Sequence, residues 1–113
     1  MITLDERVIL WLAVEEYAEL WEVVWQLRSL RPRDSEADLG QVATTVVAGL
    51  LQRGWVNLYR CEEPYGELFE IPRDEAEGLL ADEASWCEPA AEKVSIRIGA
   101  TASGEEVYRQ WRI

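Results

Sequence analysis

Histidine is absent from this chain of 113 residues, and cysteine occurs only at Cys61 and Cys87. The lack of histidine excludes Ser-His-Asp and Cys-His nucleophiles, the HExxH zinc motif and the most common general base near neutral pH. Two cysteines alone cannot supply the four ligands of a structural zinc ion. We therefore predict no enzymatic activity and no bound metal. Chemistry carried by carboxylates alone stays the weakest alternative, because no Asp or Glu pair can be singled out.

Glycine motifs that cradle phosphates are missing as well. The seven glycines are scattered and form neither GxGxxG nor GxxxxGK[ST], so no nucleotide or other cofactor is predicted. Carboxylates are numerous between residues 62 and 83, but they lack the Asp-x-Asp-x-Asp-Gly spacing of a calcium loop. This favours a solvated acidic face over a cation site.

Long hydrophobic runs are also lacking. The longest, from Val8 to Val14, falls far short of the ~20 residues that span a bilayer. The first residues do not show a basic region followed by an apolar one, as a secretory signal would. We expect a cytoplasmic protein that makes no membrane contact and keeps both cysteines as free thiols.

The residues that are present predict one folded domain over residues 1–113. The hydrophobic fraction of 49% is typical of a globular protein, and the length suffices for a single core. The net charge is −11, and residues 61–90 alone carry −9 of it. A domain charged in this way repels nucleic acid and anionic membranes, and it attracts partners with a basic or mixed surface.

Hydrophobic spacing predicts three helices in the N-terminal half. The first covers about residues 5–14 and is apolar nearly all the way round, and the second covers about residues 17–30. Since no Gly or Pro separates them, one long kinked helix is the alternative. Pro32 ends the second helix, Ser35 is the expected N-cap of the third, and Gly54 marks its end.

The third predicted helix has one apolar and one polar side. Its polar side is uncharged, which is unusual in so acidic a chain. Glutamine and threonine can contact either protein or DNA bases. The candidate interaction residues on this side are Gln41, Thr44, Thr45 and Gln52.

The C-terminal half alternates strands and helices. Residues 56–61 and 68–71 predict a β-hairpin, with Tyr65 in its turn as a further candidate contact. Pro72 opens a short acidic helix that extends to about Ala81. Residues 94–99 form the last predicted strand, and Thr101 or Ser103 caps a terminal helix.

Two stretches resemble winged helix-turn-helix regulators. The passage from Leu50 through Gly54 to Arg60 looks like the junction of a recognition helix and the first wing strand. Residues 95–106, with Thr101 and Gly104, are similar to the capped Thr-x-x-Gly turn that follows the last wing strand in MarR-like and PadR-like groups. The resemblance implies an α+β, winged-helix-like fold with three N-terminal helices, a β-hairpin wing, and a C-terminal strand and helix. The chain departs from the pattern by inserting the short acidic helix into the wing.

Residues 72–92 form the other predicted interaction element. So many carboxylates with so few bases exclude deep burial, so we expect an appended surface element outside the main core. Leu79, Leu80 and Trp86 would dock it against the hairpin or the terminal helix. Its outward carboxylates are candidate contacts for a basic partner: Glu75, Glu77 and Glu83.

Six tryptophans are many for this length. Trp11 and Trp21 are expected in the core. Trp25 lies at the edge of the apolar arc of its helix and Trp111 lies near the chain end, so these two are candidate interface anchors.

The residues favour a protein-interaction or regulatory module. A DNA-binding transcriptional regulator is the alternative, with the third helix in the major groove. It is disfavoured because affinity for DNA depends on Lys and Arg contacts to phosphates, whereas carboxylates surround this helix and the hairpin turn.

Overall fold

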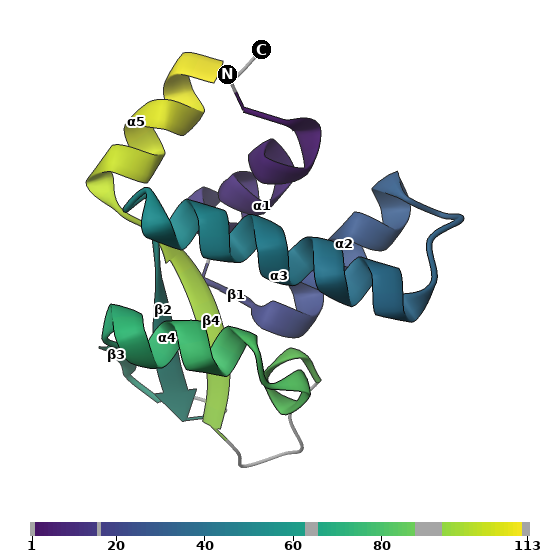
Figure 1. Cartoon of the computed structure of the whole chain (residues 1–113). Coiled ribbons are helices and arrows are strands. Elements are labelled where there is room, and N and C mark those ends of the chain that lie inside the picture. The colour runs from purple at the N-terminus through teal and green to yellow at the C-terminus, as the bar shows by residue number, and fades with distance from the viewer. Residues whose placement is uncertain (1, 16, 63–65, 88–93, 112–113) are drawn as a thin grey trace.

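The computed structural model describes residues 2–15, 17–62, 66–87 and 94–111. Within them lie five α-helices and a four-stranded antiparallel sheet, an α+β fold (Figure 1). In chain order the elements are α1 (Leu4–Glu15), β1 (Ala18–Glu19), α2 (Leu20–Leu30), α3 (Glu36–Gln52), β2 (Val56–Glu62), β3 (Leu68–Glu70), α4 (Arg73–Leu80), the 3₁₀ turn η1 (Glu83–Trp86), β4 (Val94–Ala100) and α5 (Ala102–Trp111).

A two-residue strand separates the first two helices, so the alternative of one long kinked helix is excluded. We predicted that the second helix starts at about residue 17, but Ala18 and Glu19 are extended and pair with Ile98 and Arg97 of β4. The Arg97 guanidinium also donates a hydrogen bond to the Tyr17 carbonyl. Helical spacing in this segment was therefore overridden by pairing with a strand about 80 residues away in sequence.

The sheet has the order β1-β4-β2-β3. Strand β2 pairs with β4 along its whole length, from Val56 opposite Ala100 to Glu62 opposite Val94. The shorter β3 pairs with the other edge of β2. The hairpin turn holds Glu63, Pro64 and Tyr65, which lie outside the described residues, so the candidate Tyr65 has no structural account.

Helix α3 begins after Ser35 and ends just before Gly54, as the sequence predicts. Ser35 is its N-cap and accepts a hydrogen bond from the Asp38 amide. Gly54 has a φ of +74°, and the Trp55 amide reaches back to the Leu50 carbonyl. This left-handed turn, which favours glycine, directs the chain straight into β2.

The core lies between the sheet and helices α1 to α4. Its largest fully buried side chains come from all three N-terminal helices and from the strands β2 and β4, including Ile9, Leu10, Val23, Leu27, Leu39, Val47, Leu50, Leu58 and Ile98. Trp11 is 41% exposed, so its expected place in the core was wrong. Because α1 is apolar nearly all the way round, its sequence does not indicate which side faces the sheet.

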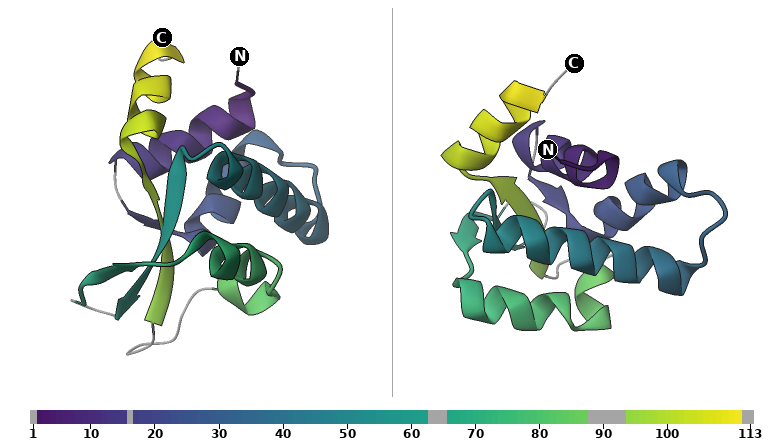
Figure 2. Two further views of the ribbon diagram at one scale, coloured as in Figure 1. Left: turned by 60° about the vertical axis from the view of Figure 1, so that its left-hand side comes forward. Right: turned by 45° about the horizontal axis from the view of Figure 1, so that its top comes forward.

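Helix α4 belongs to this core, which corrects the expectation of an appended element. Ala76 and Leu80 are spaced one helical turn apart, and both are buried in the main cluster together with Ile71. The helix packs against α3 and β2, and η1 packs against α2. The contact with β2 confirms the expected docking on the hairpin, whereas the packing against α3 was not expected. Figures 1 and 2 show α4 lying antiparallel beside α3.

Candidate functional site

The outward side of α3 carries the polar residues that the sequence singled out. Gln41, Thr45 and Gln52 are exposed. Thr44 is half-buried, and its hydroxyl donates to the Gly40 carbonyl at 2.8 Å, which occupies its donor within the helix. The exposed polar side of α3 is therefore narrower than its helical wheel predicts.

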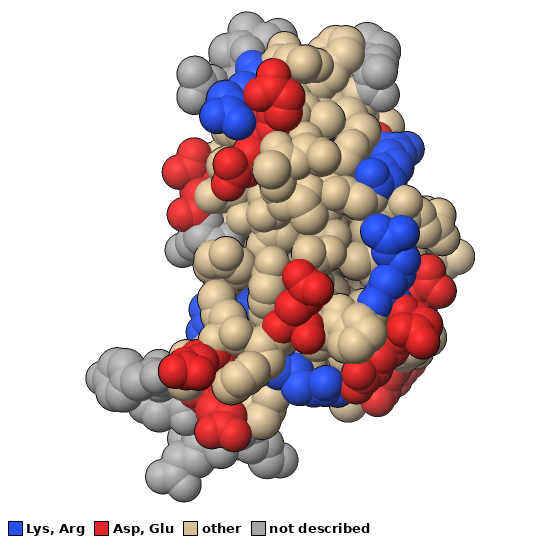
Figure 3. Space-filling view, turned by 90° about the vertical axis from the view of Figure 1, so that its left-hand side faces the viewer, with Lys and Arg blue, Asp and Glu red and all other residues tan. Residues whose placement is uncertain are grey.

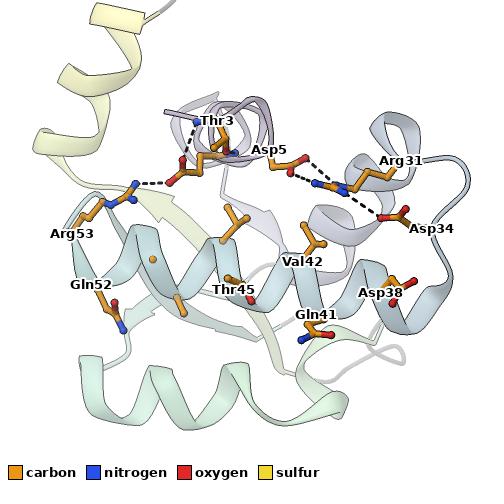
Figure 4. Close-up of a pocket in the computed structure, with 14 residues that line it drawn as sticks. Thr3, Asp5, Arg31, Asp34, Asp38, Gln41, Val42, Thr45, Gln52 and Arg53 are labelled. Carbon is orange, nitrogen blue, oxygen red and sulfur yellow. Dashed lines mark hydrogen bonds and ion pairs between the residues drawn. The ribbon is translucent and has the colours of Figure 1, made fainter. Parts of the chain in front are cut away.

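One hollow, which we call the α1–α3 groove, lies between α3 and the start of α1. It has a volume of about 880 Å³. Half-buried Val42 and Val46 line it from α3, and Thr3, Asp5 and Glu6 line it from the opposite side (Figure 4). The sequence does not predict this groove, because its two sides come from segments about 40 residues apart.

Ion pairs close both ends of the α1–α3 groove, as the dashed lines in Figure 4 show. At one end Arg31 donates to Asp5 at 2.6 Å and to Asp34 at 3.3 Å. At the other end Arg53 pairs with Glu6. The bonds to Asp5 raise the pKa of the Arg31 guanidinium above its ordinary value. Both arginines of the groove are therefore engaged by carboxylates of the chain itself.

Glu6 is the most enclosed carboxylate of the groove. It forms a capping box with Thr3: the Thr3 amide donates to Glu6, and the Glu6 amide donates to the Thr3 hydroxyl. Burial by itself would raise the pKa of Glu6, but the hydrogen bonds from Thr3 and Arg53 outweigh it and hold the pKa below its ordinary value. The ionised form is thus the one that the fold stabilises.

Replacing Glu6 with glutamine should make the free energy of unfolding less dependent on acid pH. A carboxyl group whose pKa is lower in the folded than in the unfolded chain stabilises the fold at pH values above its unfolded-state pKa. This stabilisation is lost as the pH falls through the folded-state pKa. Urea titrations at about pH 6 and about pH 3 measure the free energy of unfolding at each pH. Between these two pH values it should fall further in the wild type than in E6Q. Equal losses in the two proteins would contradict the role of Glu6.

A second hollow, the α3–α4 groove, lies on the other side of α3. Its volume is about 770 Å³. Gln41, Thr44 and Thr45 line it from α3, and Glu83 and Trp86 line it from η1. Two candidate sets that the sequence treated separately, the polar side of α3 and the acidic segment, are therefore neighbours.

Comparisons with protein-family models, curated protein sequences and solved structures found no match. Across the described part of the chain, no three His, Cys, Asp or Glu side chains gather so as to hold a metal ion. None of the described helices is long and apolar enough to cross a membrane. The two cysteines are free, with Cys61 buried and Cys87 exposed.

The remaining candidates are dispersed over the surface. Glu75, Glu77 and Glu83 are all exposed as expected, and Glu75 also pairs with Arg60 of β2 at 2.5 Å. Trp25 and Trp111 are both exposed, and neither lines the two grooves beside α3. Trp21, expected in the core, is half-buried, and its indole nitrogen donates to Glu19 at 2.7 Å.

The charged side chains are mixed in sign over the face that lies to the left in Figure 1. Figure 3 shows acidic and basic groups interspersed there, with a wide uncharged area between them.

Proposed function

We propose that this chain is a protein-interaction module built on a winged-helix-like scaffold, with the outer side of α3 as its binding face. Three features support the scaffold. Three helices precede the main strands, α3 passes through the left-handed Gly54 directly into β2, and β2 pairs with β4 as two wing strands would.

One observation carries the choice of protein over DNA: both sides of α3 are flanked by grooves with an excess of carboxylates. The α1–α3 groove has four carboxylates and two arginines, and the arginines are paired within the chain. The α3–α4 groove adds Glu36 and Glu83. Since DNA affinity rests mainly on cationic contacts to phosphates, this charge opposes docking on a duplex.

The position of α4 supports the same conclusion by charge. Helix α4 lies beside α3 (Figures 1 and 2) and carries exposed carboxylates at Asp74, Glu75 and Glu77. It therefore offers carboxylates next to α3, where a bound duplex needs cations.

A DNA titration tests this choice directly. Fluorescence anisotropy on a mixed-sequence duplex and on the duplex upstream of its own gene should detect no submicromolar binding at about 0.15 M salt. In parallel, nuclease-treated lysate of the source organism should yield a stoichiometric protein partner. The Q41R/T45R variant, which changes two exposed residues of α3 that line both grooves, should lose that partner. Submicromolar DNA binding would refute the proposal.

A further inference from the structure

Gly49 is a glycine in the interior of α3 that the fold itself does not require. A Cβ built at Gly49 meets nothing within 4 Å, and the φ of Gly49 lies outside the left-handed region that favours glycine. Glycine inside a helix is less favourable than alanine, because more backbone freedom is lost on folding. Gly49 lines the α1–α3 groove, so its missing side chain leaves the groove open at this point.

The floor of the groove has the spacing of a helix-binding surface. Val42, Val46 and Gly49 follow at i, i+4 and i+7 along α3 and all line the groove. At 1.5 Å per residue they cover about 10 Å. Figure 4 shows Val42 pointing to the α1 side of α3, whereas Gln41 and Gln52 point to the α4 side. An amphipathic helix places its own apolar residues at the same spacing.

The rim of the groove selects the charge of its occupant. Asp5, Glu6, Asp34 and Asp38 face two arginines, which leaves a net charge of −2. A second copy of this chain carries a net charge of −11 and would meet repulsion there. A segment bearing Lys or Arg beside its apolar residues is attracted, and it can share the carboxylates with Arg31 and Arg53.

We propose that the α1–α3 groove binds a short, basic amphipathic helix of another protein. The apolar side of that helix lies on Val42 and Val46, its cations reach the carboxylates of the rim, and Gly49 allows close approach of its backbone. This proposal rests on the proposed protein-binding function, and it specifies the kind of partner segment that this chain binds.

An unbiased peptide selection provides the probe. A phage-displayed library of helical peptides about 16 residues long, long enough to form a helix on binding, is selected on the whole chain. Enriched peptides should carry net positive charge and apolar residues at i, i+4 and i+7. The best one, synthesised with fluorescein, is then titrated by anisotropy. Its affinity should fall as salt is raised from about 0.05 to about 0.3 M.

Two matched glycine variants locate the peptide. G49L places a side chain in the groove, and G78L places the same side chain on α4, where a Cβ at Gly78 also meets nothing within 4 Å. Both variants should melt at or above the wild-type temperature, because leucine favours a helix more than glycine does. G49L should bind the peptide at least about tenfold more weakly, while G78L should bind it as the wild type does. If G49L fails to fold, G49A serves in its place, with a smaller loss expected.

Three outcomes overturn the assignment. The first is that the selection enriches acidic or neutral peptides. The second is that the selected peptide binds the wild type and G49L with equal affinity. The third is that a parallel selection on G49L enriches basic amphipathic peptides as strongly as the selection on the wild type. Tight peptides that bind G49L as they bind the wild type, but lose binding to Q41R/T45R, would leave the outer side of α3 as the binding face and refute the groove. Submicromolar DNA binding would instead refute the proposed function.

Discussion

A single aspartate at position 76 should unfold most of the protein at a urea concentration that leaves the wild type native. Ala76 is fully buried in the main hydrophobic core, so the A76D carboxylate would have to be desolvated among apolar side chains. An uncompensated buried charge costs about 3–5 kcal/mol, a large part of the ~5–15 kcal/mol that stabilises a domain of this size.

Urea denaturation followed by far-UV circular dichroism measures this loss. The matched control is E77D, which places aspartate at the neighbouring exposed position and should change the free energy of unfolding by less than about 0.5 kcal/mol. L80A removes a second buried side chain of α4 and should cost about 2–5 kcal/mol. If A76D unfolded at the wild-type midpoint, α4 would be an appended element after all.

G104A should also destabilise the protein strongly, although alanine is normally favoured in a helix. A Cβ at Gly104 would lie 1.9 Å from the carbonyl oxygen of Trp55 and 2.8 Å from its carbon. Both are backbone atoms of the turn between α3 and β2, so they cannot turn aside as a side chain would. Either α5 or that turn has to move.

The contact lies within a small network centred on Thr101. Its hydroxyl donates to the Gly54 carbonyl at 2.6 Å and accepts from the Gly104 amide at 3.1 Å. Its own amide donates to the Trp55 carbonyl at 2.9 Å. Thr101, rather than Ser103, is therefore the N-cap of α5, and it joins α5 to the end of α3. Any movement of α5 would strain these hydrogen bonds.

We expect G104A to lower the free energy of unfolding by about 2 kcal/mol or more, as overpacking against rigid atoms does. Hydrogen exchange should show reduced protection across α5. S103A, at the exposed neighbouring position, should stay within about 0.5 kcal/mol of the wild type. A stabilising G104A would mean that α5 does not approach Trp55 as closely as the structure places it.

The sequence by itself determined most of the helices and strands, because their signals are local. Ser35, Gly54 and Pro72 act on neighbouring backbone groups, so the limits that they set for α3 and α4 were predicted within a few residues. Alternation likewise located β2 and β4. The exposure of Trp25 was predicted from the edge of one helical arc.

Tertiary structure alone decided the features that depend on partners distant in sequence. The extended conformation of Ala18 and Glu19 is set by pairing with β4, and the side on which α1 is buried is set by the sheet. The place of α4 beside α3 depends on which surface remained for Ala76 and Leu80 to bury. The α1–α3 groove exists only where Asp5, Glu6 and Arg31 meet α3. Local spacing gives each segment its conformation and its apolar side, but the fold decides which two sides meet.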